Sequence, residues 1–198
     1  MAYYDPLTCL PNRAYIYRQL ECTLTEAVRE QDKVALMFID LDGFKYINDT
    51  FGHSMGDQIL KELATRLKRV VPSQGIIGRF GGDEFILLLP HLKSKEEAIA
   101  NAETIIESFQ EPFFIDGHEL YLSVSIGISL FPDDGDDLET VIKHADISMY
   151  EAKNRGNNHY QFYTGQNENF PRRIMMERHL RTAIQKMNFK STINHKWT

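Results

Sequence analysis

The sequence has few cysteines and no long apolar run. Of its 198 residues only Cys9 and Cys22 are cysteines, too few for a disulfide framework or a four-cysteine zinc site. Apolar runs such as residues 85–90 are far shorter than the roughly 20 residues of a membrane-spanning helix. The first residues lack the apolar segment of a secretory signal. We therefore expect a cytoplasmic domain without membrane contact, to which a membrane anchor or sensor could be joined in a longer protein.

Positive charge is also in short supply. The chain has 22 lysines and arginines against 28 aspartates and glutamates, a net charge of −6 with histidine neutral. This excess of negative charge repels nucleic-acid phosphates and argues against a general nucleic-acid-binding protein. An anionic ligand would need a local site of lysines, metal ions or backbone N–H groups. Hydrophobic residues make up 42% of the chain, which is enough for a packed core.

The hydrophobic pattern predicts helices that alternate with strands. Residues 33–40 are apolar on both faces, as in a central strand, and a hairpin joins the strands predicted over 75–80 and 84–89. The other expected elements are helices over 11–28, 56–70, 95–109 and 138–154, strands within 111–131, and a strand over 159–163. Because the hairpin interrupts the alternation, we expect an α/β (α+β) fold: a mixed central β-sheet surrounded by helices.

The character of the chain changes near its C-terminal end. Residues 167–169 form a polar break, and residues 170–187 have the periodicity of an amphipathic helix with arginines on its polar side. A simple alternative is a connector helix whose arginines are solvated. We expect one domain over residues 1–165, followed by a linker helix and tail over residues 166–198.

Two aspartates stand at the end of the predicted central strand. Asp40 and Asp42 flank Leu41, and Gly43, Phe44 and Lys45 follow. Ligands collect at the carboxyl ends of strands in α/β sheets, and carboxylates suit Mg²⁺ or Mn²⁺ when substrate phosphates complete the coordination. Gly43 permits close approach of a phosphate, and Lys45 adds a positive charge. Taken alone, Asp-x-Asp is also common in surface turns.

A second pair of acids occurs in the predicted hairpin. Gly81 and Gly82 are followed directly by Asp83 and Glu84. Adjacent like charges repel unless a cation or solvent offsets them, while the two glycines leave room for a nucleotide. The alternative is an exposed type I′ turn flanked by acids. The aspartates at the neighbouring strand end favour a metal site.

Two further segments carry polar groups that suit a nucleotide. Asn48 offers donors and acceptors and Asp57 accepts, so together they could read guanine. The alternative is a capped helix–loop–helix in which Asp57 is a first-turn acid. Lys153 and Arg155 lie near the end of a predicted helix, where cations are favoured in any case. No Walker A loop occurs, which argues against P-loop nucleotide hydrolases.

Taken together, these segments resemble the GGDEF family of diguanylate cyclases. The similarity extends over residues 5–163 and is carried by residues 5–13, 40–49, 81–85 and 145–156. The resemblance implies a fold similar to those of nucleotidyl cyclases and polymerase palms. It also implies condensation of two GTP molecules into cyclic di-GMP with release of pyrophosphate.

The resemblance also implies roles for individual residues. Two Mg²⁺ or Mn²⁺ ions per active site would be held by Asp40, Glu84, Asp83 and the Leu41 carbonyl. Asp83 and Glu84 would be catalytic, with Asp83 a metal ligand or the group that assists deprotonation of the attacking 3′-hydroxyl. The remaining residues would bind GTP: Gly43, Phe44, Lys45 and Lys153 its phosphates, Gly81 and Gly82 its body, and Asn48 and Asp57 its guanine base.

Two positions depart from the family pattern. Asn157 stands where the family often has a basic residue. Pro72 and Gly75 replace the Arg and Asp of an inhibitory product site, so we expect no such site here. Because each domain would hold one GTP, turnover implies a transient homodimer. The helix over 170–187 looks like the lead-in to an EAL-type phosphodiesterase domain, and the alternative function is therefore a GTP-binding regulatory module with little turnover that controls this neighbour.

Overall fold

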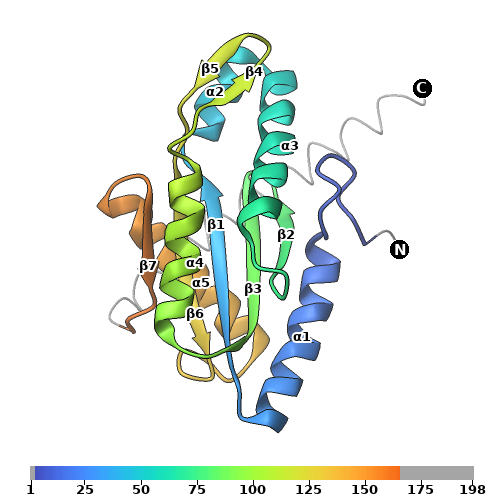
Figure 1. Cartoon of the computed structure of the whole chain (residues 1–198), viewed down its shortest axis with the longest axis vertical. Helices are drawn as coiled ribbons and strands as arrows, with labels where there is room; N and C mark the ends of the chain where they lie inside the picture. Colours follow the sequence, from blue (N-terminus) through green and yellow to red (C-terminus); the bar gives the residue numbers. More distant parts are fainter. Residues whose placement is uncertain (1–2, 166–198) are drawn as a thin grey trace, which may run out of the picture. The chain divides into compact units, whose positions relative to one another are not determined.

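The computed structural model of the chain describes residues 3–165 (Figure 1). The elements below belong to the unit Met1–Tyr163. The predicted helix over 170–187 and the predicted tail after it lie outside the described residues. Among the residues that the structure describes, no helix combines the length and apolarity needed to cross a bilayer.

A five-stranded sheet forms the centre of the fold, in the order β2-β3-β1-β6-β7. β1 lies in the middle, antiparallel to both β3 and β6, whereas β7 runs parallel to β6. Every residue of β1 after Lys33 is buried, which confirms the prediction of a central strand. The strands are β1 (Lys33–Leu41), β2 (Ile76–Gly81), β3 (Glu84–Leu92), β6 (Val124–Phe131) and β7 (His159–Phe162). The predicted mixed sheet is thus confirmed.

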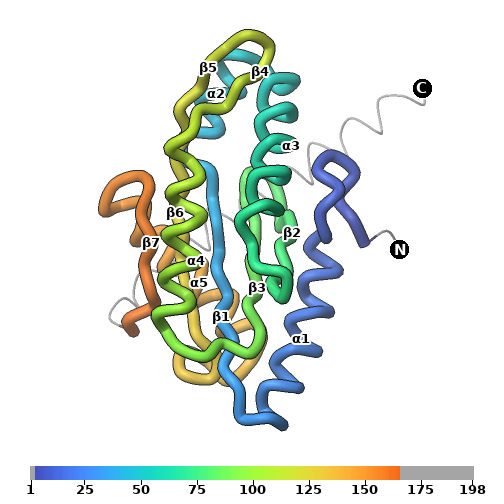
Figure 2. Tube along the Cα trace, in the orientation of Figure 1, coloured from blue at the N-terminus to red at the C-terminus, as the bar shows by residue number. Residues whose placement is uncertain are grey.

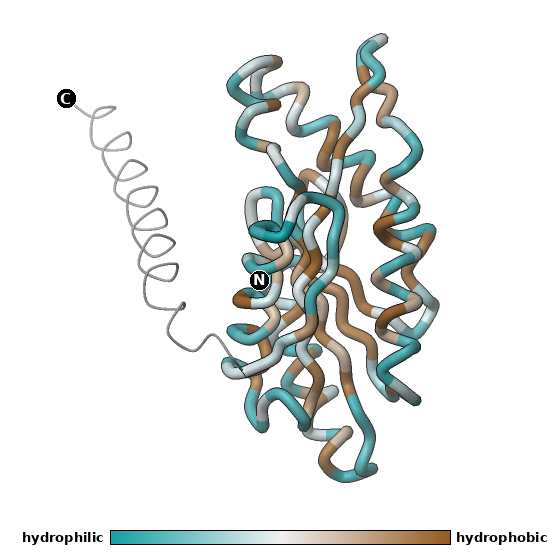
Figure 3. The backbone as a smooth tube through the Cα atoms, turned by 90° about the vertical axis from the view of Figure 1, so that its left-hand side faces the viewer, coloured by the Kyte–Doolittle hydropathy of each residue, from teal (hydrophilic) through white to brown (hydrophobic). Residues whose placement is uncertain are grey.

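Helices cover both faces of this sheet (Figures 1 and 2). Because side chains alternate along a strand, Met37 and Ile39 belong to an apolar cluster with α3 and α4, and Leu36 and Phe38 to another with α1 and α5. Figure 3 shows hydrophobic residues concentrated along the strands between the helices. The helices concerned are α1 (Arg13–Glu30), α3 (His53–Val70), α4 (Lys95–Ser108) and α5 (Leu138–Arg155).

The segment after β1 differs from the prediction, in which the next helix covers residues 56–70. Helix α2 (Phe44–Phe51) begins directly after Gly43, and α3 begins at His53. Gly43 and Gly52 have φ angles of 72° and 85°, a conformation that glycine adopts without steric cost. Ile47 is the buried residue of α2, so the helix leaves little hydrophobic periodicity in the sequence. β1 points toward the end of the molecule where α2 lies with β4 (Phe113–Ile115) and β5 (His118–Leu120) (Figure 1).

The turn between β2 and β3 is not the type I′ turn considered from the sequence. Gly81 pairs with Glu84 as the last residue of β2, so the two-residue loop consists of Gly82 and Asp83. Gly82 has a positive φ of 52°, and Asp83 is not among the positive-φ residues. A type I′ turn requires positive φ at both loop residues. The shift by one residue places the Asp83 carboxylate in the turn itself.

At Gly127 of β6, helix α5 packs closely on the sheet. A Cβ atom at this position would overlap the Ala145 carbonyl oxygen and the Met149 nitrogen, and would lie 2.7 Å from the Met149 Cα. Since these are backbone atoms, the helix itself would have to move. We expect Gly127→Ala to lower the free energy of unfolding by about 3 kcal/mol or more, measured by urea denaturation.

Gly81→Ala is the matched control for this change. A Cβ atom at Gly81 would have no neighbour within 4 Å, so the same substitution should alter the stability by less than about 0.5 kcal/mol. Equal effects of the two substitutions would contradict the close packing of α5 on β6.

Candidate active site

The acidic residues singled out in the sequence meet at one end of the sheet. Asp40 stands near the end of β1, where its Cα is opposite that of Glu84 on β3. The Leu41 N–H donates to the Asp83 carbonyl at 3.3 Å, which joins the strand end to the turn. The Asp40 side chain is only 8% exposed, whereas Asp83 and Glu84 are half-buried. Strand register therefore brings together the predicted metal ligands Asp40, Leu41, Asp83 and Glu84.

Lys153 reaches this acidic cluster from the last turn of α5. Its Nζ lies 2.5 Å from Asp40 Oδ1. The pKa of Asp40 is raised to about 7, chiefly by burial and next by the charge of the Asp83 carboxylate, while Lys153 opposes the rise. The charges of Asp83 and Glu84 both act to raise the pKa of Asp40, so the three carboxylates form a negatively charged set of hard oxygen donors. Such a set fits a divalent cation of the Mg²⁺ type.

Asp42 does not join this cluster. Its carboxylate accepts hydrogen bonds from the hydroxyls of Ser123 and Ser125, both at 2.8 Å. These bonds fasten the segment after β1 to β6 and account for an aspartate that is only 9% exposed. Of the two aspartates in the Asp-x-Asp pattern, only Asp40 is therefore available at the acidic cluster.

The hairpin is anchored by an arginine that the sequence reasoning did not single out. Arg79 donates from Nε and Nη2 to the Gly82 carbonyl at 2.9 and 2.8 Å, and from Nη1 to Asp5 Oδ1 at 3.0 Å. Burial acts to raise the pKa of Asp5, but hydrogen bonds from Thr8 and Arg79 lower it. The N-terminal motif over 5–13 thus holds the turn between β2 and β3. The sequence signal that could have indicated this contact is a pair of opposite charges: Asp5 in the N-terminal motif and Arg79 near the two glycines.

The predicted phosphate-binding residues lie at the start of α2. Gly43 is the N-cap residue of this helix, and Phe44 and Lys45 form its first turn, with Lys45 exposed. A helix N-terminus presents free N–H groups and a partial positive charge, which favour an anion. Because only two residues separate β1 from α2, these groups lie close to the end of the strand that carries Asp40.

Asn48 and Asp57 come from neighbouring helices. Asn48 lies on α2 with its amide against Gly56 of α3, and Asp57 is the next residue, exposed to solvent. The fold therefore brings the two predicted guanine-reading residues close together. Pro72 and Gly75, the positions compared with an inhibitory site, lie between α3 and β2, where the Gly75 N–H donates to the Pro72 carbonyl at 2.8 Å.

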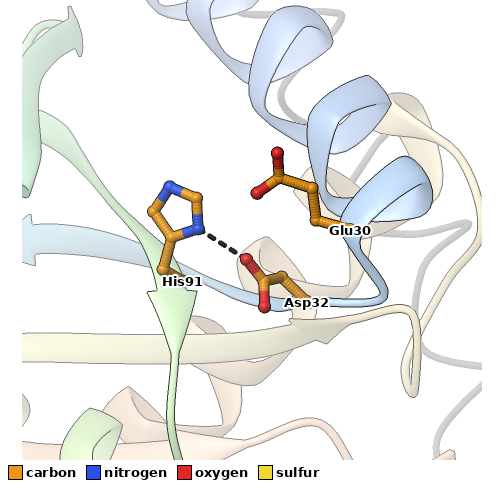
Figure 4. Close-up of side chains that lie close together, drawn as sticks. All are labelled: Glu30, Asp32 and His91. Carbon is orange, nitrogen blue, oxygen red and sulfur yellow. Dashed lines mark hydrogen bonds and ion pairs between the residues drawn. The ribbon is translucent and has the colours of Figure 1, made fainter.

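A different group of potential metal ligands lies at the opposite end of β1. Glu30, Asp32 and His91 have ligand atoms within 4.8 Å of one another (Figure 4). His91 Nδ1 lies 2.6 Å from Asp32 Oδ2, and this hydrogen bond raises the pKa of His91. Asp32 precedes β1, whereas Asp40 stands near its end, so the two groups are separate. The hydrogen bond between His91 and Asp32 accounts for the approach of these two side chains without an ion.

The arrangement matches a known family. The family model "Diguanylate cyclase, GGDEF domain" matches residues 2–159. The chain therefore belongs to the GGDEF family, which confirms the resemblance drawn from its motifs.

Curated relatives from two bacteria are similar to almost the whole chain. The bifunctional diguanylate cyclase/cyclic di-GMP phosphodiesterase MucR of Pseudomonas aeruginosa is 38% identical over 94% of this chain. The signaling protein YkoW of Bacillus subtilis is 42% identical over 96% of it. The chain spans only about a quarter of the length of these relatives, 27% and 24% respectively.

A solved structure of the GGDEF domain of TpbB (YfiN) from Pseudomonas aeruginosa confirms the fold. It superposes with a TM-score of 0.81 at 36% identity, and the match covers 87% of this chain and 99% of that domain. The fold that positions the acidic cluster is thus the fold of an isolated GGDEF domain.

Proposed function

We propose that the domain is a diguanylate cyclase that condenses two GTP molecules into cyclic di-GMP with release of pyrophosphate. The observation that carries the proposal is the convergence of Asp40, Asp83 and Glu84 at one strand end, directly before the N-terminus of α2. An acidic site for cations beside a helix end suited to phosphates is the combination that a nucleoside triphosphate needs. Membership of the GGDEF family supports the same activity.

The acidic residues would hold two divalent cations, Mg²⁺ or Mn²⁺. Asp40, Glu84, the Leu41 carbonyl and Asp83 are the proposed ligands. When bound, the cations would neutralise the developing charge on the phosphates and the leaving pyrophosphate. The carboxylate of Asp83, placed in the turn, would accept the proton of the attacking 3′-hydroxyl or serve as a further ligand.

The remaining predicted residues would bind GTP. The N–H groups of Gly43, Phe44 and Lys45 would receive the terminal phosphates. Lys153 would exchange its ion pair with Asp40 for a phosphate oxygen once cations neutralise that carboxylate. The exposed backbone at Gly81 and Gly82 leaves space for the nucleotide, and Asn48 with Asp57 would recognise the guanine base.

Each domain would hold one GTP, so product would form only when two domains face each other as a transient homodimer. We propose that the domain works in the cytoplasm, where GTP and Mg²⁺ are available, and that sensor and EAL-type domains are linked to it in the full-length protein. The bifunctional description of MucR supports such a tandem arrangement.

Product analysis tests the proposal. The chain is incubated with GTP and Mg²⁺ or Mn²⁺ over a range of protein concentrations, and the nucleotides are separated by chromatography. Cyclic di-GMP whose rate rises more steeply than the protein concentration supports a dimeric cyclase. GTP binding without product at high concentration would instead favour the regulatory module, for which Asn157 is the specific observation, since it lacks the basic charge frequent at that position. Absence of GTP binding would contradict both.

We expect the product not to inhibit the reaction through the stretch over 72–75. Neither Pro72 nor Gly75 carries a charge that could pair with a phosphate or an arginine, so the contacts of an Arg-x-x-Asp site are missing. Initial rates measured with and without added cyclic di-GMP check this expectation. Inhibition at low micromolar product concentration would contradict it.

A further inference from the structure

Gly56 lies where α3 meets α2. A Cβ atom at this position would overlap Oδ1 of Asn48, and would lie 3.0 Å from Asn48 Cγ and 3.1 Å from Phe44 Cζ. The amide of Asn48 and the ring of Phe44 therefore rest on the bare Cα of Gly56. Two residues on one face of α2 occupy the space that any other amino acid at position 56 would need.

The backbone conformation does not require glycine at this position. Gly56 is helical and is not among the glycines with positive φ, unlike Gly43 and Gly52. A glycine inside a helix costs about 1 kcal/mol relative to alanine. The close approach of Asn48 is the feature that only glycine permits here.

The backbone of the junction is fixed independently of the Asn48 side chain. The Gly52 N–H donates to the Asn48 carbonyl at 2.9 Å, and the Gly56 N–H donates to the Gly52 carbonyl at 3.3 Å. The atoms that would meet a new Cβ belong to side chains, in contrast to Gly127, where they belong to the backbone. A methyl group at position 56 would thus be accommodated by displacing the Asn48 amide, with the helices remaining in place.

We propose that Gly56 is a positioning residue that determines base specificity: the space it leaves holds the Asn48 amide beside Asp57 for recognition of guanine. The inference rests on the proposed function, in which Asn48 and Asp57 read the base. Hydrogen bonds to a base require placement within a few tenths of an ångström, and a misplacement of about 1 Å can cost roughly a hundredfold. The substrate class is a purine nucleotide with the N1–H and 2-amino donors of guanine.

Substitution of Gly56 by alanine tests this role in the whole chain. Gly56→Ala should raise the KM for GTP by about tenfold or more, the energy of one well-placed polar contact, with kcat changed by less than about threefold. Inosine triphosphate lacks the 2-amino group, so the preference for GTP over it should fall by a similar factor. Equilibrium binding of both nucleotides, measured by calorimetry with Ca²⁺ in place of Mg²⁺, supplies the same ratio without turnover.

A double-mutant cycle separates displacement of Asn48 from general damage. Asn48→Ala removes the atom that the new methyl group meets, so Gly56→Ala in that background should raise KM no further. If Gly56→Ala also lowers the free energy of unfolding, Asn48→Ala should restore it. Gly75→Ala is the matched control, because its Cβ would approach Val71 Cγ1 to 2.9 Å just before β2, at the other end of this strand from the turn with Asp83, and it should keep the GTP preference.

The outcomes distinguish failure of the proposed function from failure of the role inferred for Gly56. A wild-type chain that binds no GTP would overturn the proposed function and the inference with it. A wild-type chain that prefers GTP, together with a Gly56→Ala variant of unchanged preference, would overturn the inference alone. Additive effects of the Gly56 and Asn48 substitutions on KM would also overturn it.

Discussion

Replacing Glu84 by glutamine should lower the formation of cyclic di-GMP by about a hundredfold to a thousandfold. Glu84 stands at the start of β3 opposite Asp40, and its carboxylate adds to the negative charge around Asp40. Glutamine keeps the size of the side chain but removes the charge that a cation would neutralise. Since Glu84 is only half-buried, the variant should fold, so loss of product would report on chemistry.

Glu107→Gln is the control for the loss of one carboxylate. Glu107 is exposed on α4, so this variant has the same net charge as Glu84→Gln and should retain the wild-type rate. Both variants are compared by chromatography of the products at equal, high protein concentration. A Glu84→Gln variant with more than a tenth of the wild-type rate would contradict the proposed role of this residue.

Replacing Asp40 by asparagine should abolish product formation and yet stabilise the metal-free protein above pH 7. Burial and the neighbouring Asp83 raise the pKa of Asp40 to about 7, against about 3.9 in an unfolded chain. Between these values the native state binds more protons than the unfolded state, so the contribution of Asp40 to stability falls as the pH rises through this window. Above pH 7 the buried Asp40 carboxylate is charged, and the full cost of burying this charge lowers the stability of the native state. Asparagine carries no charge and removes this cost.

The size of this effect follows from the shift. Three pKa units correspond to at most about 4 kcal/mol, and loss of the bond to Lys153 offsets part of it. We therefore expect Asp40→Asn to gain about 1–2 kcal/mol at pH 8 and almost nothing at pH 4. Urea denaturation in the presence of a chelator measures both values, and addition of Mg²⁺ should stabilise the wild-type chain more than the variant.

Asp133→Asn is the control for the pH experiment. Asp133 pairs with Lys33 at the opposite end of β1 and is 46% exposed, so its substitution should change stability little at either pH. An equal gain for Asp40→Asn at pH 4 and pH 8 would show that packing, not charge burial, is responsible. That outcome would contradict a destabilising buried charge on Asp40 at the proposed active site.

Local chemistry in the sequence was sufficient to predict the central strand, the long helices, the hairpin and the residues of the acidic cluster. An apolar run without polar interruption predicts burial on both faces, and helical periodicity survives wherever one face meets the core. The beginning of α2 was not predictable in this way, because Ile47 is the buried residue of that helix. The type of the hairpin turn was not predictable either. Strand register pairs Gly81 with Glu84 and so makes Gly82 and Asp83 the loop residues.

Only the tertiary structure decided which polar groups meet. Lys153 reaches Asp40 across 113 residues, and Arg79 reaches Asp5 across 74. Asp40 and Asp42 are equivalent in the sequence pattern, but Ser123, just before β6, and Ser125, within it, bind Asp42, and only Asp40 joins the acidic cluster. Such pairings depend on sheet register and helix packing, which arise from the burial of the whole core. The sequence by itself determined the family and the residues that we propose for the active site, and long-range packing determined which side chains those residues contact.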